Sequence, residues 1–246
     1  HAPGLKYGFA EVLRAAHHTL LAHGRAVQAI REHAVKPPWI GWAPVGAGAL
    51  PATESEADIA AARKATLAIT EHNLWNNTWF SDPVFLGHYP EDGLALFGSA
   101  VPEHTEEEMR IISEPVDFYG MNIYTGGRVK AGPDGEPVPV EEPPGNPRTL
   151  FYWPVRPESL YWIPRFLHER YGKPLAITEN GLSNQDWVAL DGHVHDPQRI
   201  DFLTRYLVQL HRAIGDGVDI RAYFQWSIMD NFEWADGYRQ RFGLIH

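Results

Sequence analysis

Apolar residues along the chain follow two kinds of pattern, helical spacing and short continuous runs. Residues 8–34 have apolar side chains at helical spacing, Leu13 and Leu20 among them, so this segment is predicted to form one long helix. Two prolines at positions 37 and 38 end that pattern. The apolar run at 39–44 that follows has the length of a strand.

A second helix is predicted at 54–80, where helical spacing returns. Thr53 precedes this segment and Glu56 stands three residues after it. That spacing is typical of a capping box, in which the two side chains bond free backbone N–H groups of the first turn. Thr53 is therefore the expected N-cap.

Strands and helices continue to alternate through the rest of the chain. The patterns predict a strand at 116–124, a helix at 157–171, a strand at 175–178, a helix at 196–214 and a strand at 220–228. The stretch at 131–147 is rich in Pro and Gly and is predicted to be a long surface loop. This alternation indicates an α/β fold with a parallel sheet, either doubly wound or a (β/α)8 barrel. Periodicity alone does not choose between the two.

Length, charge and composition narrow the class of protein. The chain has 246 residues, 44% of them apolar, which suits a single domain with a large core. A net charge of −10 without any cluster of Lys and Arg disfavours a nucleic-acid partner. The absence of Cys excludes disulfides and cysteine nucleophiles. No apolar run reaches the roughly 18 residues of a membrane span, so no membrane partner is predicted. The compartment stays open, with the cytoplasm favoured.

Thirteen histidines raise the question of a metal site. His17 and His18 are neighbours on the predicted first helix and point in different directions, and neither has a His or carboxylate one turn away. The sequence therefore predicts no metal and no cofactor.

Polar residues gather where the predicted strands end. Asn122 and Tyr124 lie at the C-terminal end of one strand, Glu179 follows the next, and Asp230 with Glu233 follows the last. In parallel α/β folds the carboxyl ends of the strands carry the active site. A carboxylate at the end of an apolar strand is held on rigid backbone, which makes Glu179 the strongest catalytic candidate. The alternative for Glu179 is a structural ion pair.

Several longer motifs resemble those of glycoside hydrolase family 1. The segment 177–181 (ITENG) resembles the nucleophile motif of that family, and 225–234 (QWSIMDNFEW) resembles its sugar-binding segment. Further matches are 117–124 (DFYGMNIY), 79–83 (WFSDP), 87–90 (GHYP) and 1–4 (HAPG). The resemblance covers essentially the whole chain.

The resemblance implies a (β/α)8 TIM barrel, of which this chain carries roughly strands five to eight. Residues 1–246 are accordingly expected to be the C-terminal part of a single barrel domain. The family's general acid/base is the Glu of an Asn-Glu-Pro motif on strand four, and no such motif occurs here. A complementary N-terminal barrel segment is therefore an expected partner.

The resemblance also implies the activity and the site residues. The expected function is a retaining β-glycosidase, β-glucosidase-like, acting on a small β-glycoside or oligosaccharide with an unphosphorylated terminal hexose; glucose, galactose and fucose stay open. Glu179 is the implied nucleophile and Tyr124 the donor that holds it. The implied substrate-binding residues are Glu233, Trp226, Trp234, Trp153, Asn122 and Phe242. The peptide joining Trp226 to Ser227 is expected to be cis.

Other interpretations of these residues remain open. Tyr124 is alternatively a buried phenol bonded to backbone, Glu233 a solvated loop residue, Phe242 a core residue, and Asn122 the cap of a turn. At the level of function, the main alternative is a noncatalytic or split-barrel fragment that binds sugar but is inactive alone. A relative with a replaced acid carboxylate is a third possibility.

Overall fold

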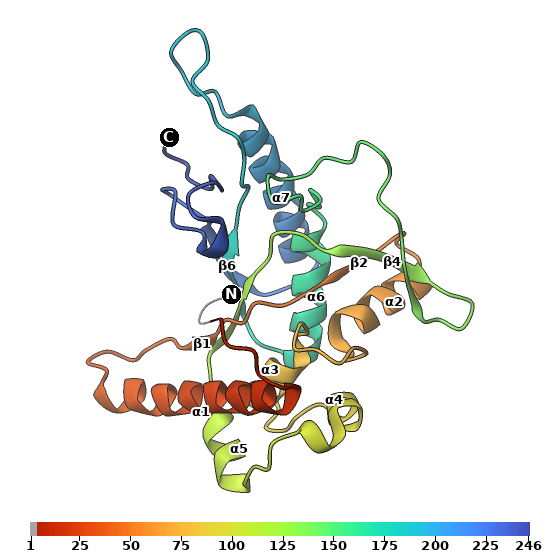
Figure 1. Cartoon of the computed structure of the whole chain (residues 1–246), viewed down its shortest axis with the longest axis vertical. Coiled ribbons are helices and arrows are strands. Elements are labelled where there is room, and N and C mark those ends of the chain that lie inside the picture. The colour runs from red at the N-terminus through yellow and green to blue at the C-terminus, as the bar shows by residue number, and fades with distance from the viewer. Residues whose placement is uncertain (1–3) are drawn as a thin grey trace.

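A computed structural model describes residues 4–246 of the chain (Figure 1). Its central sheet has four parallel strands in the order β1 (Gly41–Trp42), β3 (Phe118–Asn122), β6 (Leu175–Asn180) and β7 (Ile220–Gln225). Each strand of this sheet pairs with the next along the chain, without the reversal of order that marks a doubly wound sheet. The order is that of an arc of a barrel.

Helices connect and cover these strands. They are α1 (Phe9–His33), α2 (Glu56–Leu67), α3 (Thr78–Phe85), α4 (Glu91–Phe97), α5 (Glu106–Ile112), α6 (Ser159–Tyr171) and α7 (Pro197–Gly215), with 3-10 turns η1 (Gly98–Ala100) and η2 (Trp234–Asp236). One apolar core joins α6 and α7 to the sheet through residues such as Phe166, Tyr206 and Ile177. A second core includes Leu13, Trp79 and Ile112. Within residues 4–246, no helix has the length and apolarity needed to span a membrane.

The predicted alternation of strands and helices is confirmed, with shifted ends. The strand predicted at 220–228 ends at Gln225, and the one predicted at 39–44 is reduced to Gly41–Trp42. Of the 1–4 stretch that contributed to the family resemblance, residues 1–3 lie outside the described part of the chain.

The single helix predicted at 54–80 is wrong, because α2 ends at Leu67 and α3 begins only at Thr78. The buried amide of Asn77 donates hydrogen bonds to the backbone carbonyls of Ala47 and Thr66, at 2.5 and 2.7 Å. These bonds hold the chain before α3 against the end of α2 and against the loop after β1. The segment 68–77 is therefore a loop fixed by tertiary contacts.

The predicted capping box of that helix is also wrong. Ser55 is the N-cap of α2, and its hydroxyl accepts from the backbone N–H of Asp58. The Thr53 hydroxyl instead donates to the Asp58 carboxylate at 2.7 Å. Because Asp58 also accepts from the backbone N–H of Ala131 at 2.8 Å, its carboxylate joins α2 to a second, smaller sheet.

The prediction of one long surface loop at 131–147 is wrong in part, because this segment contributes a strand to the smaller sheet. Its order is β2 (Ala49–Pro51), β4 (Gly127–Ala131) and β5 (Pro137–Pro139), and β5 pairs antiparallel with β4. The predicted loop therefore contains an edge strand. Proline is accepted there because an edge strand leaves some N–H positions without a ladder partner.

Helices α4 and α5 were not predicted from the sequence. For α5 a signal was available, because Thr105 and Glu108 form a complete capping box, with the Glu108 carboxylate accepting from the Thr105 N–H at 2.7 Å. Both helices are short, with few turns over which a period could be recognised.

Replacement of Gly24 by Ala is expected to destabilise the packing of α1 on α5. A Cβ at position 24 would lie 1.9 Å from the backbone oxygen of Ile111, which cannot move without shifting α5. We expect a loss of about 1–3 kcal/mol in the free energy of unfolding, measured by urea titration. Gly215→Ala is the control, because nothing lies within 4 Å of a Cβ there. An equal effect of both substitutions would contradict the packing argument.

Acid is expected to destabilise the fold through His17 of α1. Its Nδ1 lies 2.8 Å from the Tyr89 hydroxyl, and burial lowers the pKa of His17 below its ordinary value of 6.5. The unfolded chain therefore binds the proton more readily, and the contribution of His17 to stability is complete above about pH 6.5 and is lost as pH falls through the folded-state pKa. His17→Gln should flatten the acid side of a plot of unfolding free energy against pH. His33→Gln, at an exposed position, should leave that slope unchanged.

Candidate active site

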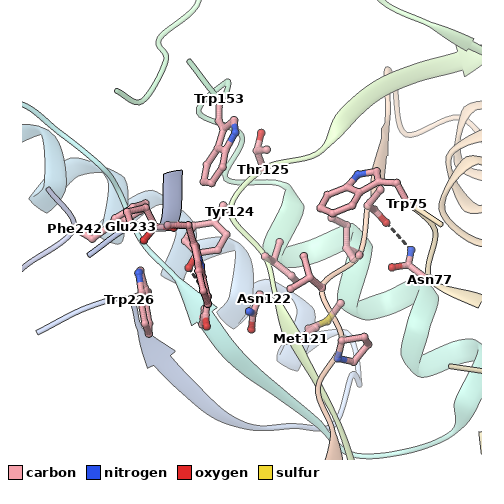
Figure 2. A pocket seen from close by; sticks show the side chains of 18 of the residues that line it. Trp75, Asn77, Met121, Asn122, Tyr124, Thr125, Trp153, Trp226, Glu233 and Phe242 are labelled. Atoms are coloured by element: carbon pink, nitrogen blue, oxygen red, sulfur yellow. Dashed lines mark hydrogen bonds between the residues drawn. The ribbon is translucent and has the colours of Figure 1, made fainter. Parts of the chain in front are cut away.

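The carboxyl ends of β3, β6 and β7 meet around one pocket (Figure 2). Asn122 at the end of β3 is the register partner of Glu179 near the end of β6. Trp226 follows β7 directly. Neighbouring parallel strands thus bring residues from three distant parts of the sequence to one edge of the sheet, as the sequence predicted.

Glu179 is held by Tyr124. The Tyr124 hydroxyl donates to Oε2 of Glu179 at 2.6 Å, and both side chains are partly buried. Burial, together with this bond and the nearby carboxylates, raises the pKa of Tyr124 above its ordinary value. The phenol therefore stays protonated and remains a donor near neutral pH. A single strong donor fixes the orientation of the carboxylate while its other oxygen stays open to the pocket.

Asn180 fixes the three strands against one another beside Glu179. Its buried side chain donates to the carbonyl of Ile123 at 2.8 Å and accepts from the Tyr223 hydroxyl at 2.9 Å. Gly181 is required next, because a Cβ there would lie 1.8 Å from the backbone oxygen of Trp226. The Asn-Gly pair after Glu179 thus lets β6 and the end of β7 approach closely.

Asn122 presents an amide to the same pocket. The Thr178 hydroxyl donates to its Oδ1 at 2.7 Å, and the side chain lines the pocket. This bond joins β3 to β6 and is not the local bond of a turn cap, which was the alternative interpretation of Asn122.

The segment after β7 carries Glu233 and Trp234 over the pocket. It begins at a cis peptide between Trp226 and Ser227, as predicted. Its two ends are tied by backbone bonds from Ser227 N to Phe242 O and from Leu244 N to Ser227 O, at 3.2 and 3.0 Å. The amide of Asn231 donates to Oε2 of Glu233 at 2.8 Å, so this carboxylate is oriented rather than freely solvated.

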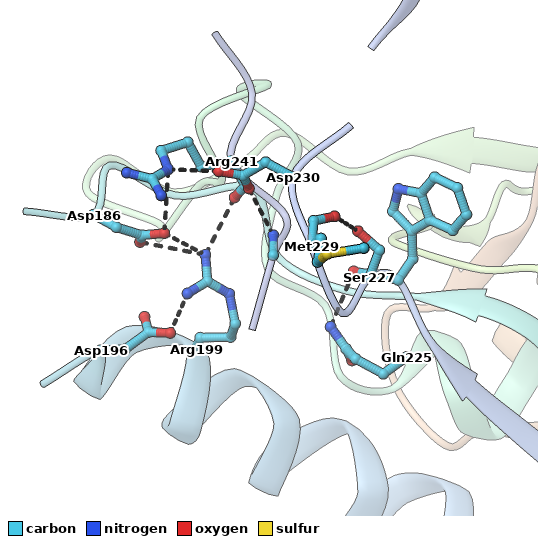
Figure 3. A network of polar contacts seen from close by, with 10 residues as sticks. Asp186, Asp196, Arg199, Gln225, Ser227, Met229, Asp230 and Arg241 are labelled. Atoms are coloured by element: carbon cyan, nitrogen blue, oxygen red, sulfur yellow. Dashed lines mark hydrogen bonds and ion pairs between the residues drawn. The ribbon is translucent and has the colours of Figure 1, made fainter. Parts of the chain in front are cut away.

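An ion network supports this segment from behind (Figure 3). Asp230 accepts from Arg241 Nε and from the Gly243 N–H, each at 2.8 Å. Arg199 of α7, only 2% exposed, pairs with Asp186 at 3.1 Å and with Asp196, and donates to the Arg241 carbonyl at 3.2 Å. Asp230, expected among the polar residues at the site, does not line the pocket. It stabilises the segment that carries Glu233.

Two stacked aromatic residues form a rigid wall on another side of the pocket. Phe151 stacks on Trp153 with ring centroids 4.6 Å apart and an angle of 10°. The face of Trp153 is thereby supported, and its centroid lies 5.3 Å from that of Tyr124. Phe242 is 2% exposed and packs edge-on to Tyr124 at 6.0 Å. Phe242 is thus a core residue that also lines the pocket.

All eight site residues predicted from the sequence line this one pocket, which has a volume of about 690 Å³. Among the described residues, the carboxylates that line it are those of Glu179 and Glu233. Sequence reasoning missed Trp75 and Asn77, which line the far end, because both fall inside the segment wrongly predicted as helix. Within residues 4–246, no group of three or more His, Asp or Glu is arranged to hold a metal ion.

The site therefore combines one carboxylate on a rigid strand end, a second on an oriented loop, amide donors and several aromatic faces. Hydroxyl-rich ligands with apolar ring faces suit such a lining. Set at the carboxyl edge of a barrel-like parallel sheet, these features are those of a carbohydrate-acting α/β barrel enzyme.

Comparison with known proteins makes the assignment specific. Residues 1–246 match the family model described as glycosyl hydrolase family 1, and the chain belongs to this family. It is 40% identical over 247 residues to beta-glucosidase A of Thermotoga maritima, covering 100% of this chain and 54% of the relative. It is 39% identical over 248 residues to a 1,4-beta-D-glucan glucohydrolase of Thermotoga neapolitana, covering 100% of this chain and 56% of that protein.

Solved structures agree with this assignment. The family 1 β-glucosidase from Thermotoga maritima in complex with isofagomine lactam superposes with a TM-score of 0.80 at 40% identity, covering 99% of this chain and 53% of that one. Its complex with glucoimidazole gives 0.81 at 41% identity, with the same coverage. The chain thus spans about half the length of the relatives it matches. The predicted (β/α)8 barrel, of which this chain carries a part, is confirmed, as is the predicted membership of glycoside hydrolase family 1.

Proposed function

We propose that this chain supplies the nucleophile side of a retaining β-glucosidase active site, with Glu179 as the nucleophile. The observation that carries the proposal is the 2.6 Å bond from the Tyr124 hydroxyl to Glu179, in a pocket that also holds Glu233. The similarity to proteins named beta-glucosidase A and 1,4-beta-D-glucan glucohydrolase supports the same activity.

The reaction follows from the position of Glu179. Its free oxygen attacks the anomeric carbon, and the bond to the leaving oxygen breaks with the electron pair going to that oxygen. A protonated carboxyl group donates a proton to the leaving group, and water later cleaves the glycosyl ester with that same group as base. Retention requires these two carboxyl groups roughly 5–5.5 Å apart. Glu233 is held by Asn231 on the loop beyond β7. We propose that Glu233 accepts hydrogen bonds from the sugar hydroxyls and is not the proton donor.

The proposed substrate is a terminal unphosphorylated β-D-hexoside, with glucose preferred. The Glu233 carboxylate accepts hydrogen bonds from sugar hydroxyls, and Trp226 and Trp234 cover the same ring. A phosphate on that sugar would meet the negative charge of Glu233 and be rejected. A relative from Bifidobacterium breve named a bifunctional beta-D-glucosidase/beta-D-fucosidase supports tolerance at the position that distinguishes those sugars.

We further propose that a complementary N-terminal barrel segment contributes strands one to four and the acid/base carboxyl group. Within residues 4–246, β1 and β7 each pair with one strand only in the parallel sheet. Phe224 on β7 is 58% exposed and Trp39 before β1 is 54% exposed. Unpaired strand edges and exposed apolar side chains need a cover. Residues 1–246 are then the C-terminal part of one barrel domain.

The test is covalent trapping with 2,4-dinitrophenyl 2-deoxy-2-fluoro-β-glucoside. Dinitrophenolate leaves without a proton, so this reagent reports the nucleophile independently of any acid. We expect the protein mass to increase by one fluoroglucosyl group, located on Glu179 by peptide mapping. A label on another residue, or no label with retained hydrolysis, would contradict the assignment of Glu179.

A second substrate distinguishes the proposed function from the alternative, a fragment that binds sugar without hydrolysing it. Cellobiose has a poor leaving group and requires the acid. Hydrolysis of both dinitrophenyl glucoside and cellobiose is expected from the assembled barrel, whereas hydrolysis of the activated substrate alone is expected where the acid is missing. Sugar binding without trapping or turnover of either substrate would establish the binding-only alternative.

A further inference from the structure

We propose that Tyr206 of helix α7 is a positioning residue for the nucleophile and acts through Tyr124. The inference rests on the proposed function, because it concerns how the Glu179 carboxylate is aligned for attack. Tyr206 does not line the pocket, and none of the family motifs in the sequence includes it. Its hydroxyl nevertheless bonds the backbone of the residue that holds Glu179.

The Tyr206 hydroxyl bridges two backbone groups. The N–H of Arg156 donates to the Tyr206 oxygen at 2.8 Å, and the Tyr206 hydroxyl donates to the carbonyl of Tyr124 at 2.9 Å. A phenol can accept and donate at the same time, so both bonds are satisfied by one group. Burial raises the pKa of Tyr206, which keeps the phenol protonated near neutral pH. The bridge therefore joins the segment after β3 to the segment before α6.

The ring that carries this hydroxyl is held in place by packing. Tyr206 is fully buried, and it stacks on Phe202, one helical turn earlier, with ring centroids 3.8 Å apart and an angle of 21°. Both rings belong to the core that joins α6 and α7 to the sheet. Because such a core is close-packed, the ring has a defined position. The hydroxyl is thus a fixed point to which the backbone of Tyr124 is attached.

This attachment lies where the bonds of the sheet end. The Ile123 N–H donates to the Glu179 carbonyl at 2.9 Å, and the Ile123 carbonyl accepts from the Asn180 amide at 2.8 Å. Tyr124 is the next residue, and its carbonyl accepts from Tyr206. Support of the backbone therefore passes from β6 to α7 at the residue whose side chain contacts the nucleophile.

A displacement of this backbone would reach the Glu179 carboxylate. The Tyr124 hydroxyl lies at the far end of its side chain and donates to Oε2 of Glu179 at 2.6 Å, a short bond with little tolerance for movement. Loss of the Tyr206 hydroxyl would leave the Tyr124 carbonyl and the Arg156 N–H without their partner. Buried polar groups are costly in that state, so the backbone is expected to shift toward new partners. Attack by Glu179 should then be impaired, whereas sugar binding should not.

Tyr206→Phe tests this role, because it removes the hydroxyl and keeps the stacked ring. Labelling of Glu179 by 2,4-dinitrophenyl 2-deoxy-2-fluoro-β-glucoside is followed by mass over a range of reagent concentrations, which separates reagent binding from attack. We expect the limiting rate of labelling to fall by a factor on the order of 10, less than the roughly 100-fold cost of a displacement of about 1 Å. The half-saturating reagent concentration should stay unchanged.

A double substitution asks whether the effect passes through Tyr124. In a Tyr124→Phe background, adding Tyr206→Phe should change the limiting rate by less than about twofold, because the bond to be positioned is already absent. A fall in rate as large as in the unsubstituted background would overturn the proposal.

Tyr89→Phe is the matched control. Tyr89 is 3% exposed, its hydroxyl lies 2.8 Å from Nδ1 of His17, and it does not line the pocket. Urea titration should show that both single variants lose stability, because each loses a buried hydrogen bond. The limiting rate of labelling should fall only in Tyr206→Phe. An equal fall in both variants would indicate a general loss of stability and would contradict positioning by Tyr206.

A spectroscopic measurement makes the test independent of the proposed reaction. In protein isotope-labelled at the tyrosine ζ carbons, the Tyr124 resonance is the one that disappears in Tyr124→Phe. Its chemical shift, which reports the bond from the phenol to Glu179, should change in Tyr206→Phe and stay the same in Tyr89→Phe. An unchanged Tyr124 resonance in Tyr206→Phe would overturn the inference. Absence of a label on Glu179 in the unsubstituted protein would instead count against the proposed function alone.

Discussion

Replacement of Glu179 by alanine is expected to lower kcat/KM for 2,4-dinitrophenyl β-glucoside by a factor on the order of 10⁴–10⁶. The activated leaving group departs without a proton, so under the proposed mechanism the reaction depends on the Glu179 carboxylate, which the Tyr124 hydroxyl contacts at 2.6 Å. Removing that carboxylate leaves water as the only nucleophile. The measurement is the initial rate of dinitrophenolate release over a range of substrate concentrations.

Azide should restore the reaction of Glu179→Ala and reveal the face of attack. A small anion in the space left by the carboxylate attacks the anomeric carbon opposite the leaving group, forming a C–N bond as dinitrophenolate leaves with the electron pair. The expected product is the α-glucosyl azide, identified by its anomeric proton coupling. Glu103→Gln, at an exposed position away from the pocket, should retain the full rate. Formation of the β-glucosyl azide, or a rate in Glu179→Ala equal to that of the unsubstituted protein, would disprove the role of Glu179 as the nucleophile.

The largest expected effect on stability comes from Asp82→Ala. Asp82 is fully buried; its carboxylate accepts two bonds from the Arg170 guanidinium, one of them at 2.9 Å, and one from the Tyr171 hydroxyl at 2.7 Å. These bonds raise the pKa of Arg170. Removal of Asp82 leaves a partly buried cation and a buried phenol without their acceptor. We expect a loss of about 2–4 kcal/mol in the free energy of unfolding, below the full cost of a buried pair because Arg170 keeps some contact with water.

The matched control for this pair is Asp201→Ala. Asp201 also binds an arginine, Arg205 at 2.7 Å, but both side chains are about 60% exposed. Its removal should cost under about 0.5 kcal/mol, because water replaces the lost partner. Urea titrations of both variants measure the difference. Similar losses in the two variants would show that burial does not determine the strength of the Asp82 pair.

Glu179 could be identified as the candidate nucleophile from the local sequence. The apolar run before Glu179 and the Asn-Gly pair after it indicate a strand that ends in a turn, and the family motif assigns the role. The same local information placed Glu233 and Trp234 after the last strand and Trp226 near the end of that strand, and the structure brings all three to the pocket. Hydrophobic periodicity predicts such elements because burial of one face is decided over a few neighbouring residues.

Tertiary contacts decided what local pattern did not. The segment 68–77 keeps helical spacing but forms a loop, because Asn77 bonds the carbonyls of Ala47 and Thr66, and that loop brings Trp75 to the pocket. Asp230 has the sequence position of a site residue, yet its bond to Arg241 places it behind the pocket. By itself the sequence determined the four strands of the central sheet and the polar residues near their carboxyl ends, whereas the smaller sheet β2-β4-β5 appeared only in the structure. Which polar side chains face a ligand and which bind one another was decided only in the folded chain, because such bonds join residues far apart in sequence and depend on the geometry of the assembled elements.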